Sequence, residues 1–494
     1  MQVLTSSSRP NILIIHADQH RKDCLGAYGN RQIKTPHLDT LAAEGVLHTK
    51  HYCSYPVCTP SRYSLLSGQY VHQHLGWSNY CTLPAGMPTF PKLLEKAGYH
   101  TAAVGKMHFT PTYMDAGFAS MTLAEQDGPG RFEDDYHDYL RKQGLLDEID
   151  LFDQRSEYRA KTDEDYWQSF GAQKSNLPLE HHSTTYITRE ASKEIATWQD
   201  GGNLLMVGYI KPHHPFDPPA PYADLYDPDQ LELLPGYTPE IHDASAKGKG
   251  YFENSRLSEA ALRHVMALYY GTITQIDDSV GQLIKQLKEK QLYDKTIIVY
   301  TSDHGDYMGY HHLLLKGNRM FEPLMNIPLI VKPIENQAGM CDQLSSNTDL
   351  AGYLLKACGL EPSSGMSVYD LMSDKQARPY VIAESGHGSG QVSYMVRDQR
   401  YKLLLEGAMD AVVLYDLEED PCELEDIASR EGSAPIIERL KQALFDEVLF
   451  KAPSSVHVDV KAPVISQIDP DCLERRRQRL LDWHQEVTGI EPDL

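Results

Sequence analysis

One cysteine in this sequence has neighbours that suit chemistry on an anion. Cys58 opens residues 58–68, in which Pro60 suits the first turn of a helix and Gly68 suits its end. Cys58 is therefore expected just before a helix N-terminus, where backbone N–H groups favour bound anions. Arg62 can direct its guanidinium to the same place. An isolated cysteine is usually inert packing, but this segment predicts an anion site that contains one.

Carboxylates and an amide follow other apolar runs. Asp18 and Gln19 come after one run, and Asp303 and His304 come after another that is far away in the sequence. Hard divalent cations prefer oxygen ligands and accept an imidazole, which leaves Ca²⁺, Mg²⁺ and Mn²⁺ as candidates. Taken singly, each aspartate would more simply cap a helix after a strand.

Basic residues stand at comparable positions. Lys106 and His108 follow a third apolar run, His213 follows a fourth, and Lys316 comes shortly after the aspartate–histidine pair. Lysines can neutralise anionic oxygens, and histidines can move protons. A single residue of this kind is more often structural, so the prediction depends on the group. The rivals of His213 are His214, His311 and His312.

The runs that deliver these residues are interpreted as short buried strands between helices. Apolar residues recur at helical spacing over residues 262–287, and helices are also predicted at residues 36–45 and 89–97. This alternation implies a large, mainly parallel sheet flanked by helices. Such sheets bind ligands outside the carboxyl ends of their strands, where the polar residues fall. The predicted strands lie at residues 11–15, 101–104, 204–210, 296–301 and 328–331.

The rest of the chain has a different pattern. Residues 130–200 are acidic and aromatic, and they are interpreted as helical insertions that border the pocket or as a solvated surface excursion. We expect a catalytic α/β domain at residues 1–365 and a smaller C-terminal α+β subdomain and tail, with an antiparallel sheet, at residues 366–494. Its predicted elements are strands at residues 392–396, 401–405 and 412–417, and helices at residues 435–449 and 474–483.

The composition excludes some classes of partner. The 494 residues carry a formal net charge of -23, which argues against nucleic acid or an anionic membrane surface. There is no apolar run of about 18 residues, so no transmembrane helix is expected. The N-terminus lacks the features of a signal peptide, so the chain as given is expected in the cytoplasm, or in the periplasm or secreted if a leader has been removed. The cysteine spacing predicts no disulfide framework, and a homo-oligomer is left open.

The cysteine segment resembles the motif of the formylglycine-dependent sulfatases, a family of the alkaline-phosphatase-like superfamily. The resemblance lies in residues 58–62, which read Cys-Thr-Pro-Ser-Arg, and in the Ser-Gly pair that follows. It implies that a formylglycine-generating enzyme oxidises Cys58, and that the hydrated aldehyde is the nucleophile. Ser67 departs from the threonine usual in the family but keeps a hydroxyl.

The same resemblance implies a metal site. It places Asp18, Gln19, Asp303 and His304, with residue 58, around one divalent cation. Ca²⁺ is preferred, with Mg²⁺ or Mn²⁺ as alternatives. Many relatives carry Asp in place of Gln19 and Asn in place of His304, so both positions depart from the commonest pattern.

Further segments are similar to the substrate motifs of the family. Residues 105–108 match Gly-Lys-x-His, residues 212–215 match Pro-His-x-Pro, and a lysine follows the second metal strand where relatives have a substrate lysine. Protonation of the leaving group is assigned to His213 or Lys316 without a choice. The resemblance therefore implies catalytic roles for Cys58, Arg62, Lys106, His108, His213 and Lys316.

The predicted function is hydrolysis of a sulfate monoester of a carbohydrate or a small alcohol, so the expected partner is a small-molecule or saccharide sulfate ester. The alternative is a phosphonate monoester or phosphodiester hydrolase with the same nucleophile. Lys106 disfavours it, because two lysines suit a compact, dianion-like transition state. An inactive, sulfoglycan-binding relative is the alternative from another class, and it requires that Cys58 remain a thiol.

Overall fold

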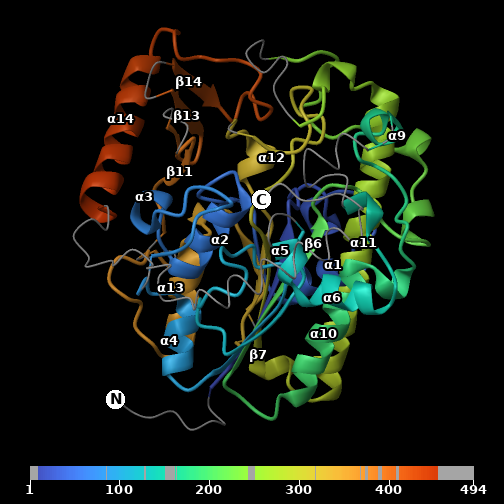
Figure 1. The fold of residues 1–494 in the computed structure, drawn as a ribbon. Coiled ribbons are helices and arrows are strands. Elements are labelled where there is room, and N and C mark those ends of the chain that lie inside the picture. Colours follow the sequence, from blue (N-terminus) through green and yellow to red (C-terminus); the bar gives the residue numbers. More distant parts are fainter. Residues whose placement is uncertain are drawn as a thin grey trace, which may run out of the picture.

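The computed structural model has an eight-stranded sheet at its centre (Figure 1). The strand order is β5-β4-β6-β1-β7-β8-β2-β9. Neighbours from β5 to β7 are parallel, whereas β8 pairs antiparallel with both β7 and β2. The expected large, mainly parallel sheet is thereby confirmed. The structure describes residues 9–84, 86–126, 130–150, 162, 164–242, 251–317, 319–335, 337–367, 369–372, 377–387, 392–407 and 411–453.

The central strands are buried along almost their whole length. β1 (Asn11–Asp18) and β6 (Asn203–Pro212) have no exposed residue. Nearly continuous apolar runs are typical of strands that are covered on both faces. Because β1 continues through Asp18, this aspartate is the last residue of the strand. The other strands of the sheet are β2 (Val46–His48), β4 (His100–Gly105), β5 (Ser120–Leu123), β7 (Thr296–Ser302), β8 (Leu329–Lys332) and β9 (Gly339–Cys341).

Helices cover both faces of this sheet (Figure 1). Along β1, Leu13 and Ile15 pack toward one helical layer, while Ile12 and Ile14 pack toward the other. The first layer holds α1 (Pro36–Glu44), α10 (Ser183–Thr197) and α11 (Glu259–Glu289); the second holds α2 (Cys58–Ser67), α4 (Phe90–Lys96) and α13 (Asp349–Ala357). The four helices predicted from the sequence in this part are confirmed as α1, α2, α4 and α11, with small shifts at their ends.

The acidic and aromatic region at residues 130–200 contains one helix of the main layers. α10 buries Tyr186, Ile187, Ala191 and Ile195 against the core that it shares with β6 and α11. The interpretation of this stretch as an insertion or a surface excursion is therefore wrong for α10. Charged residues between the apolar positions of this helix obscured its apolar stripe in the sequence. The shorter helices are α3 (Val71–His74), α5 (Gly130–Glu133), α6 (Asp135–Lys142), α9 (Glu164–Gln168) and α12 (Glu322–Met325), and two short strands, β3 (His51–Tyr52) and β10 (Ser345–Ser346), pair with each other.

A four-stranded antiparallel sheet forms the C-terminal part, drawn in brown and orange in Figure 1. One of its faces packs under α14 (Ser433–Asp446), and the other contacts Phe321 and α12 of the preceding part. The sequence predicted three of these strands and the helix but missed β11. The strands are β11 (Val381–Ser385), β12 (Ser393–Arg397), β13 (Tyr401–Glu406) and β14 (Ala411–Asp416).

Two further expectations concern the described residues. Within them, none of the helices has both the length and the apolar character that crossing a bilayer requires. Each of the seven cysteines that the structure describes is a free thiol. The helix predicted at residues 474–483 lies outside the described residues.

Candidate active site

Cys58 is the first residue of α2, whereas the sequence placed it just before the helix. Every residue of α2 is buried, and the helix ends at Gly68, whose φ of 64° is easily adopted by glycine. The next backbone amide, that of Thr59, donates to Oδ1 of Asn79 at 3.2 Å. Cys58 thus lies at a buried helix start.

Arg62, one turn into α2, joins carboxylates from two neighbouring strand ends. Its Nη2 lies 2.9 Å from Oδ2 of Asp18, and its Nε lies 3.0 Å from Oδ2 of Asp303. Its Nη1 donates to the carbonyl of Lys106 at 2.7 Å. These donors serve the aspartates and a carbonyl, whereas the spacing predicted a guanidinium directed at the anion itself. Because the charges are buried, losing one partner would leave another uncompensated.

Four side chains direct possible metal ligands into one small space. One atom each of Asp18, Cys58, Asp303 and His304 lies within 4.8 Å of the others, and all four residues are buried. Gln19 adjoins them, and its Nε2 donates to a neighbouring carboxylate at 2.6 Å. Its Oε1 is buried and has no hydrogen-bond partner among the described residues. A buried oxygen normally has a hydrogen-bond partner or a metal partner. The oxygens of Asp18, Gln19 and Asp303, with His304, therefore fit a hard divalent cation.

Lys316 and His213 reach Cys58 from two other segments. Nζ of Lys316 lies 2.9 Å from Sγ of Cys58, 2.8 Å from Nε2 of His213 and 3.3 Å from Nε2 of His304. Burial and the Asp18 carboxylate oppose ionisation of the thiol, yet Lys316 and His304 lower the pKa of Cys58 to about 5. Burial and the Lys316 ammonium hold the pKa of His213 well below its usual range. His213 is therefore neutral beside a cation.

Lys106 directs its ammonium at the aspartate that ends β1. Its Nζ lies 2.8 Å from Oδ2 of Asp18 and 3.3 Å from Oε1 of Gln126. Gln126 is fully buried, and its Nε2 donates to the carbonyl of His214 at 2.6 Å. Gln126 thus ties the segment after β4 to the segment after β6. Gln126 could not be found from the sequence, because a lone glutamine outside any motif gives no signal.

The backbone of His108 holds its segment beside α2. Its N–H donates to Oε1 of Glu125 at 2.9 Å, and its carbonyl accepts the hydroxyl of Thr59 at 2.9 Å. Burial raises the pKa of Glu125 to about 7, although His108 opposes that rise. Because Thr59 follows Cys58 directly, these bonds keep the His108 segment next to the cysteine. Glu125 is a second residue that the sequence analysis missed.

The histidines that rival His213 have other contacts. The ring of His214 stacks on that of His213 with 4.3 Å between the centroids. Nε2 of His311 is hydrogen-bonded to a carbonyl at 2.8 Å, and so is Nδ1 of His312. The 2.8 Å contact with Lys316 belongs to His213. The geometry therefore favours His213 over its rivals.

The charges of the site favour an anionic ligand. Burial would raise the pKa of Asp18, but Lys106 and the other cations hold it well below its usual value. Burial also opposes ionisation of Asp303, whose pKa is nevertheless lowered to about 2 by His304 and Arg62. These two carboxylates and the thiol of Cys58 face the cations Arg62, Lys106 and Lys316, so a bound divalent cation would leave a positive excess. An ester of sulfate or of a phosphorus acid would balance it.

Comparisons with known proteins agree with this arrangement. The sulfatase family model matches residues 10–360, and a model described as N-sulphoglucosamine sulphohydrolase, C-terminal, matches residues 309–448. An arylsulfatase of Clostridium perfringens is 31% identical over 471 residues, which cover 89% of this chain and 94% of that protein.

Two further similar proteins act on different esters according to their names. An N-acetylglucosamine-6-O-sulfatase of Bacteroides thetaiotaomicron is 24% identical over 529 residues, covering 95% of this chain and 91% of that protein. The solved structure of the phosphonate monoester hydrolase SpPMH from Silicibacter pomeroyi superposes with a TM-score of 0.75 and 25% identity. That match covers 89% of this chain and 95% of the other.

Proposed function

Because the chain belongs to the sulfatase family and is therefore a sulfuric ester hydrolase, we propose that it cleaves sulfate monoesters with a hydrated formylglycine made from Cys58. The position of Cys58 carries this proposal. Its sulfur lies at a buried helix start, 2.9 Å from Nζ of Lys316 and 3.2 Å from Nε2 of His304. In the unmodified chain, this sulfur stands where the hydroxyls of the hydrate would lie. A formylglycine-generating enzyme is the partner that this maturation requires.

Asp18, Gln19, Asp303, His304 and the side chain of residue 58 would hold one divalent cation, for which we favour Ca²⁺ over Mg²⁺ or Mn²⁺. When bound, the cation would withdraw charge from the nucleophile and from the sulfate oxygens. The unpartnered Oε1 of Gln19 and the close approach of the other ligand atoms support this assignment.

The cationic side chains of the site would have two roles, which are to hold the carboxylates in place and to neutralise the sulfate oxygens. Arg62 keeps the carboxylates of Asp18 and Asp303 in place, so we assign it a positioning role. Lys106 and Lys316 would neutralise the peripheral oxygens of the sulfate as charge develops on them. Their ammonium groups are held near Asp18 and near residue 58, respectively.

The reaction we propose has two steps. One hydroxyl of the hydrate attacks sulfur and gives its proton to the Lys316–His213 pair. The S–O bond to the alcohol breaks, and the pair passes a proton on to the departing oxygen. The second hydroxyl then loses its proton to His108, the aldehyde re-forms, and sulfate leaves with the bonding electrons. Water adds to the aldehyde to restore the hydrate. A sulfate ester of serine would instead need water to attack sulfur again, which explains the use of a hydrate.

Activity and modification can be measured on one sample. The chain is produced together with a formylglycine-generating enzyme, and the peptide that contains residue 58 is analysed by mass spectrometry. The converted protein is then assayed on 4-nitrophenyl sulfate, choline sulfate and sulfated saccharides. We expect release of sulfate from at least one class. Full conversion of residue 58 without hydrolysis of any of them would contradict the proposal.

Hydrolysis of a phosphonate monoester is the second candidate function. The similarity to SpPMH, at a TM-score of 0.75, favours keeping it. Lys106 argues against it. Its ammonium would neutralise a third peripheral oxygen, and a phosphonate monoester has only two. A higher kcat/KM for phenyl phenylphosphonate than for every sulfate ester would make this the principal activity. Retention of an unmodified Cys58 thiol without turnover would instead indicate an inactive, sulfoglycan-binding protein.

A further inference from the structure

Lys211 is a buried lysine at the end of β6, two positions before His213. Its side chain is 0% exposed. Burial opposes the charge of Lys211, but Asp150 and Asp217 raise its pKa above the usual value, so the side chain is an ammonium ion. A charge in the interior is costly unless it is paired. The partners of this ammonium therefore indicate its role.

The ammonium closes the segment that carries His213 into a loop. Nζ of Lys211 donates to the carbonyl of Pro215 at 2.9 Å and lies 2.5 Å from Oδ1 of Asp217. Both partners come after His213 in the sequence, whereas Lys211 comes before it. The side chain of Lys211 thus joins the two ends of the turn. The backbone of residues 212–214 is held inside this loop by a buried ionic contact.

A second carboxylate connects Lys211 with Gln126. Oδ1 of Asp150 lies 3.0 Å from Nζ of Lys211 and 3.4 Å from Nε2 of Gln126. The same Nε2 donates to the carbonyl of His214 at 2.6 Å. Three separate segments of the chain therefore meet at the loop of residues 211–217. Together they hold one of its carbonyl groups, that of His214, in place.

This carbonyl group sets the tautomer of His213. Nδ1 of His213 lies 2.5 Å from the carbonyl oxygen of His214. Because a carbonyl oxygen can only accept, Nδ1 carries the proton of the neutral imidazole. Nε2 then has a free lone pair, which faces Nζ of Lys316 at 2.8 Å. The tautomer that the loop selects is the one that can exchange a proton with Lys316.

The carboxylates around Lys211 are also placed as the ligands of a metal ion would be. One oxygen each of Asp147, Asp150 and Asp217 lies within 4.8 Å of the others, and all three residues are buried. Lys211 already contacts two of them, so its ammonium fills the place of such an ion. Burial and Asp150 raise the pKa of Asp147 to about 7, which further reduces the negative charge of the group. The cluster is therefore a set of ion pairs behind the His213 loop.

From these contacts we propose that Lys211 is a positioning residue that fixes the orientation and the tautomer of His213. The proposal rests on the function proposed above, in which His213 and Lys316 move protons. Lys211 acts only through the loop that it closes. Proton transfer requires donor and acceptor atoms within hydrogen-bond reach, so a small displacement of the imidazole would slow the step.

Three variants test this role. Lys211→Met removes the ammonium and keeps the length of the side chain, but it leaves two buried carboxylates without their partner. The double variant Lys211→Met/Asp217→Asn removes one charge of each sign, and Asp217→Asn alone retains the ammonium. These two variants keep the test decisive if Lys211→Met does not fold. Thermal unfolding and circular dichroism check the fold of each protein.

Lys332→Met is the matched control. Lys332 is also buried, and its Nζ donates to the carbonyl of Tyr293 at 2.7 Å. It lies beside the start of β7, whereas Asp303 follows the end of that strand. The control therefore removes a buried ammonium at the opposite edge of the sheet from the candidate active site.

We expect both variants that lack Lys211 to lower kcat for alkyl sulfates roughly ten- to hundredfold, with KM changed less than about threefold, because a proton transfer and not binding is impaired. Asp217→Asn should show a smaller loss of the same kind, since Lys211 keeps Asp150. 4-Nitrophenyl sulfate should be affected less, because its leaving group needs little protonation. Lys332→Met should change each kcat less than about twofold. Equal losses on both classes of substrate would overturn the proposal.

A double-mutant cycle separates positioning from general support of the fold. If Lys211 acts through His213, Lys211→Met should change kcat less than about twofold in a His213→Gln background, because the residue that it positions is gone. The double variant is combined with His213→Gln in the same way. A loss as large as in the wild-type background would make Lys211 a general structural support and refute the proposal.

A measurement without turnover keeps this result separate from the proposed reaction. Nitrogen NMR of the full chain with isotope-labelled histidine shows which ring nitrogen of His213 carries the proton, and His213→Gln assigns the signals. We expect the proton on Nδ1 in wild type and Lys332→Met, but on both nitrogens in part when Lys211 is replaced. That change supports the positioning role even if no sulfate ester is cleaved. An unchanged tautomer in every variant refutes it even if sulfate esters are cleaved.

Discussion

The ammonium of Lys316 lies 2.9 Å from the sulfur of Cys58, although 258 positions separate the two residues in the sequence. The contact brings a cation from the loop after β7 to the first residue of α2. It makes residue 58 the meeting point of the proposed metal ligands and the Lys316–His213 pair.

Cys58→Ala should abolish turnover and leave the fold intact. The methyl side chain cannot become an aldehyde, and a loss of at least about a thousandfold is expected for removal of a nucleophile. Circular dichroism and thermal unfolding check the fold. Cys53→Ala is the matched control, because Cys53 is also buried but lies in a hydrophobic cluster. Comparable rates for wild type and Cys58→Ala would rule out the formylglycine mechanism.

Lys106→Ala should lower the turnover of sulfate monoesters by roughly a hundred- to thousandfold. Loss of one preorganised charge at the transition state costs about 2–4 kcal/mol. A phosphonate monoester presents one peripheral oxygen fewer, so its hydrolysis should fall less. Steady-state kinetics of both substrates on both proteins give the ratio. If the two activities fell equally, Lys106 would be a general support of the site.

Lys316→Ala and His213→Gln should differ in their dependence on the leaving group. The residue that protonates the departing oxygen matters most for alkyl sulfates, whose alcohols are poor leaving groups, and least for 4-nitrophenyl sulfate. We expect Lys316→Ala to show the steeper dependence, because Lys316 is the cation of the pair. A flat dependence in both variants would mean that neither residue donates the proton.

Gln126→Met should reduce kcat/KM about tenfold or more without unfolding the protein. The substitution removes the acceptor for Lys106 and the donor to the carbonyl of His214 while keeping the side-chain volume. Hydrogen bonds to charged groups contribute about 1.5–3 kcal/mol. Gln143→Met, at an exposed position, serves as the control. Unchanged kinetics of Gln126→Met would show that Lys106 keeps its position unaided.

Gln19→Leu should weaken binding of the divalent cation. A ligand that binds the folded state at a hundred times its Kd stabilises it by about 2.7 kcal/mol, so CaCl₂ should raise the melting temperature of wild type. The variant should show a smaller rise at the same concentration, while the two proteins should differ less in EDTA. Titrations with MgCl₂ and MnCl₂ rank the metals. Identical cation-dependent shifts would remove Gln19 from the ligand set.

The sequence by itself determined the motifs, the strands that carry them and the kind of sheet. The stretch from Cys58 to Gly68 predicted a helix, because proline and glycine mark helix ends through local backbone geometry. The alternation of apolar runs and helical stripes predicted a mainly parallel sheet, whose strand ends gather Asp18, Lys106 and Asp303. These inferences succeeded because they depend on residues that are close together in the chain.

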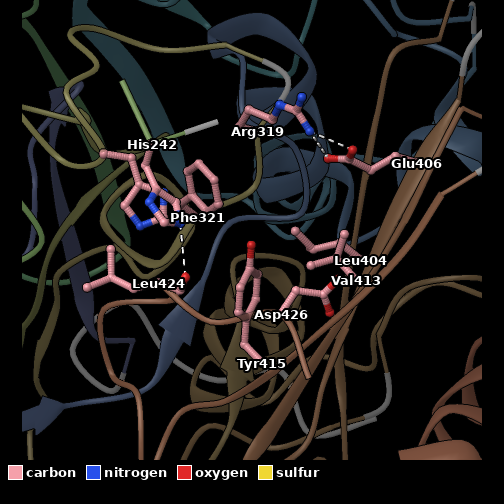
Figure 2. Close-up of a pocket in the computed structure, with 10 residues that line it drawn as sticks. His242, Arg319, Phe321, Leu404, Glu406, Val413, Tyr415, Leu424 and Asp426 are labelled. Carbon is pink, nitrogen blue, oxygen red and sulfur yellow. Dashed lines mark hydrogen bonds and ion pairs between the residues drawn. The ribbon is translucent and has the colours of Figure 1, made fainter. Parts of the chain in front are cut away.

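Only the tertiary structure decided which side chains meet. It turned the guanidinium of Arg62 to Asp18 and Asp303, placed Gln126 between Lys106 and His214, and moved α10 into the main layer. The cavity that Arg319, Glu406 and Tyr415 line arises where the C-terminal sheet packs on the loop after β7 (Figure 2). Such contacts join residues from distant strands and loops, and the partner of a buried charge depends on which groups packing excludes from water.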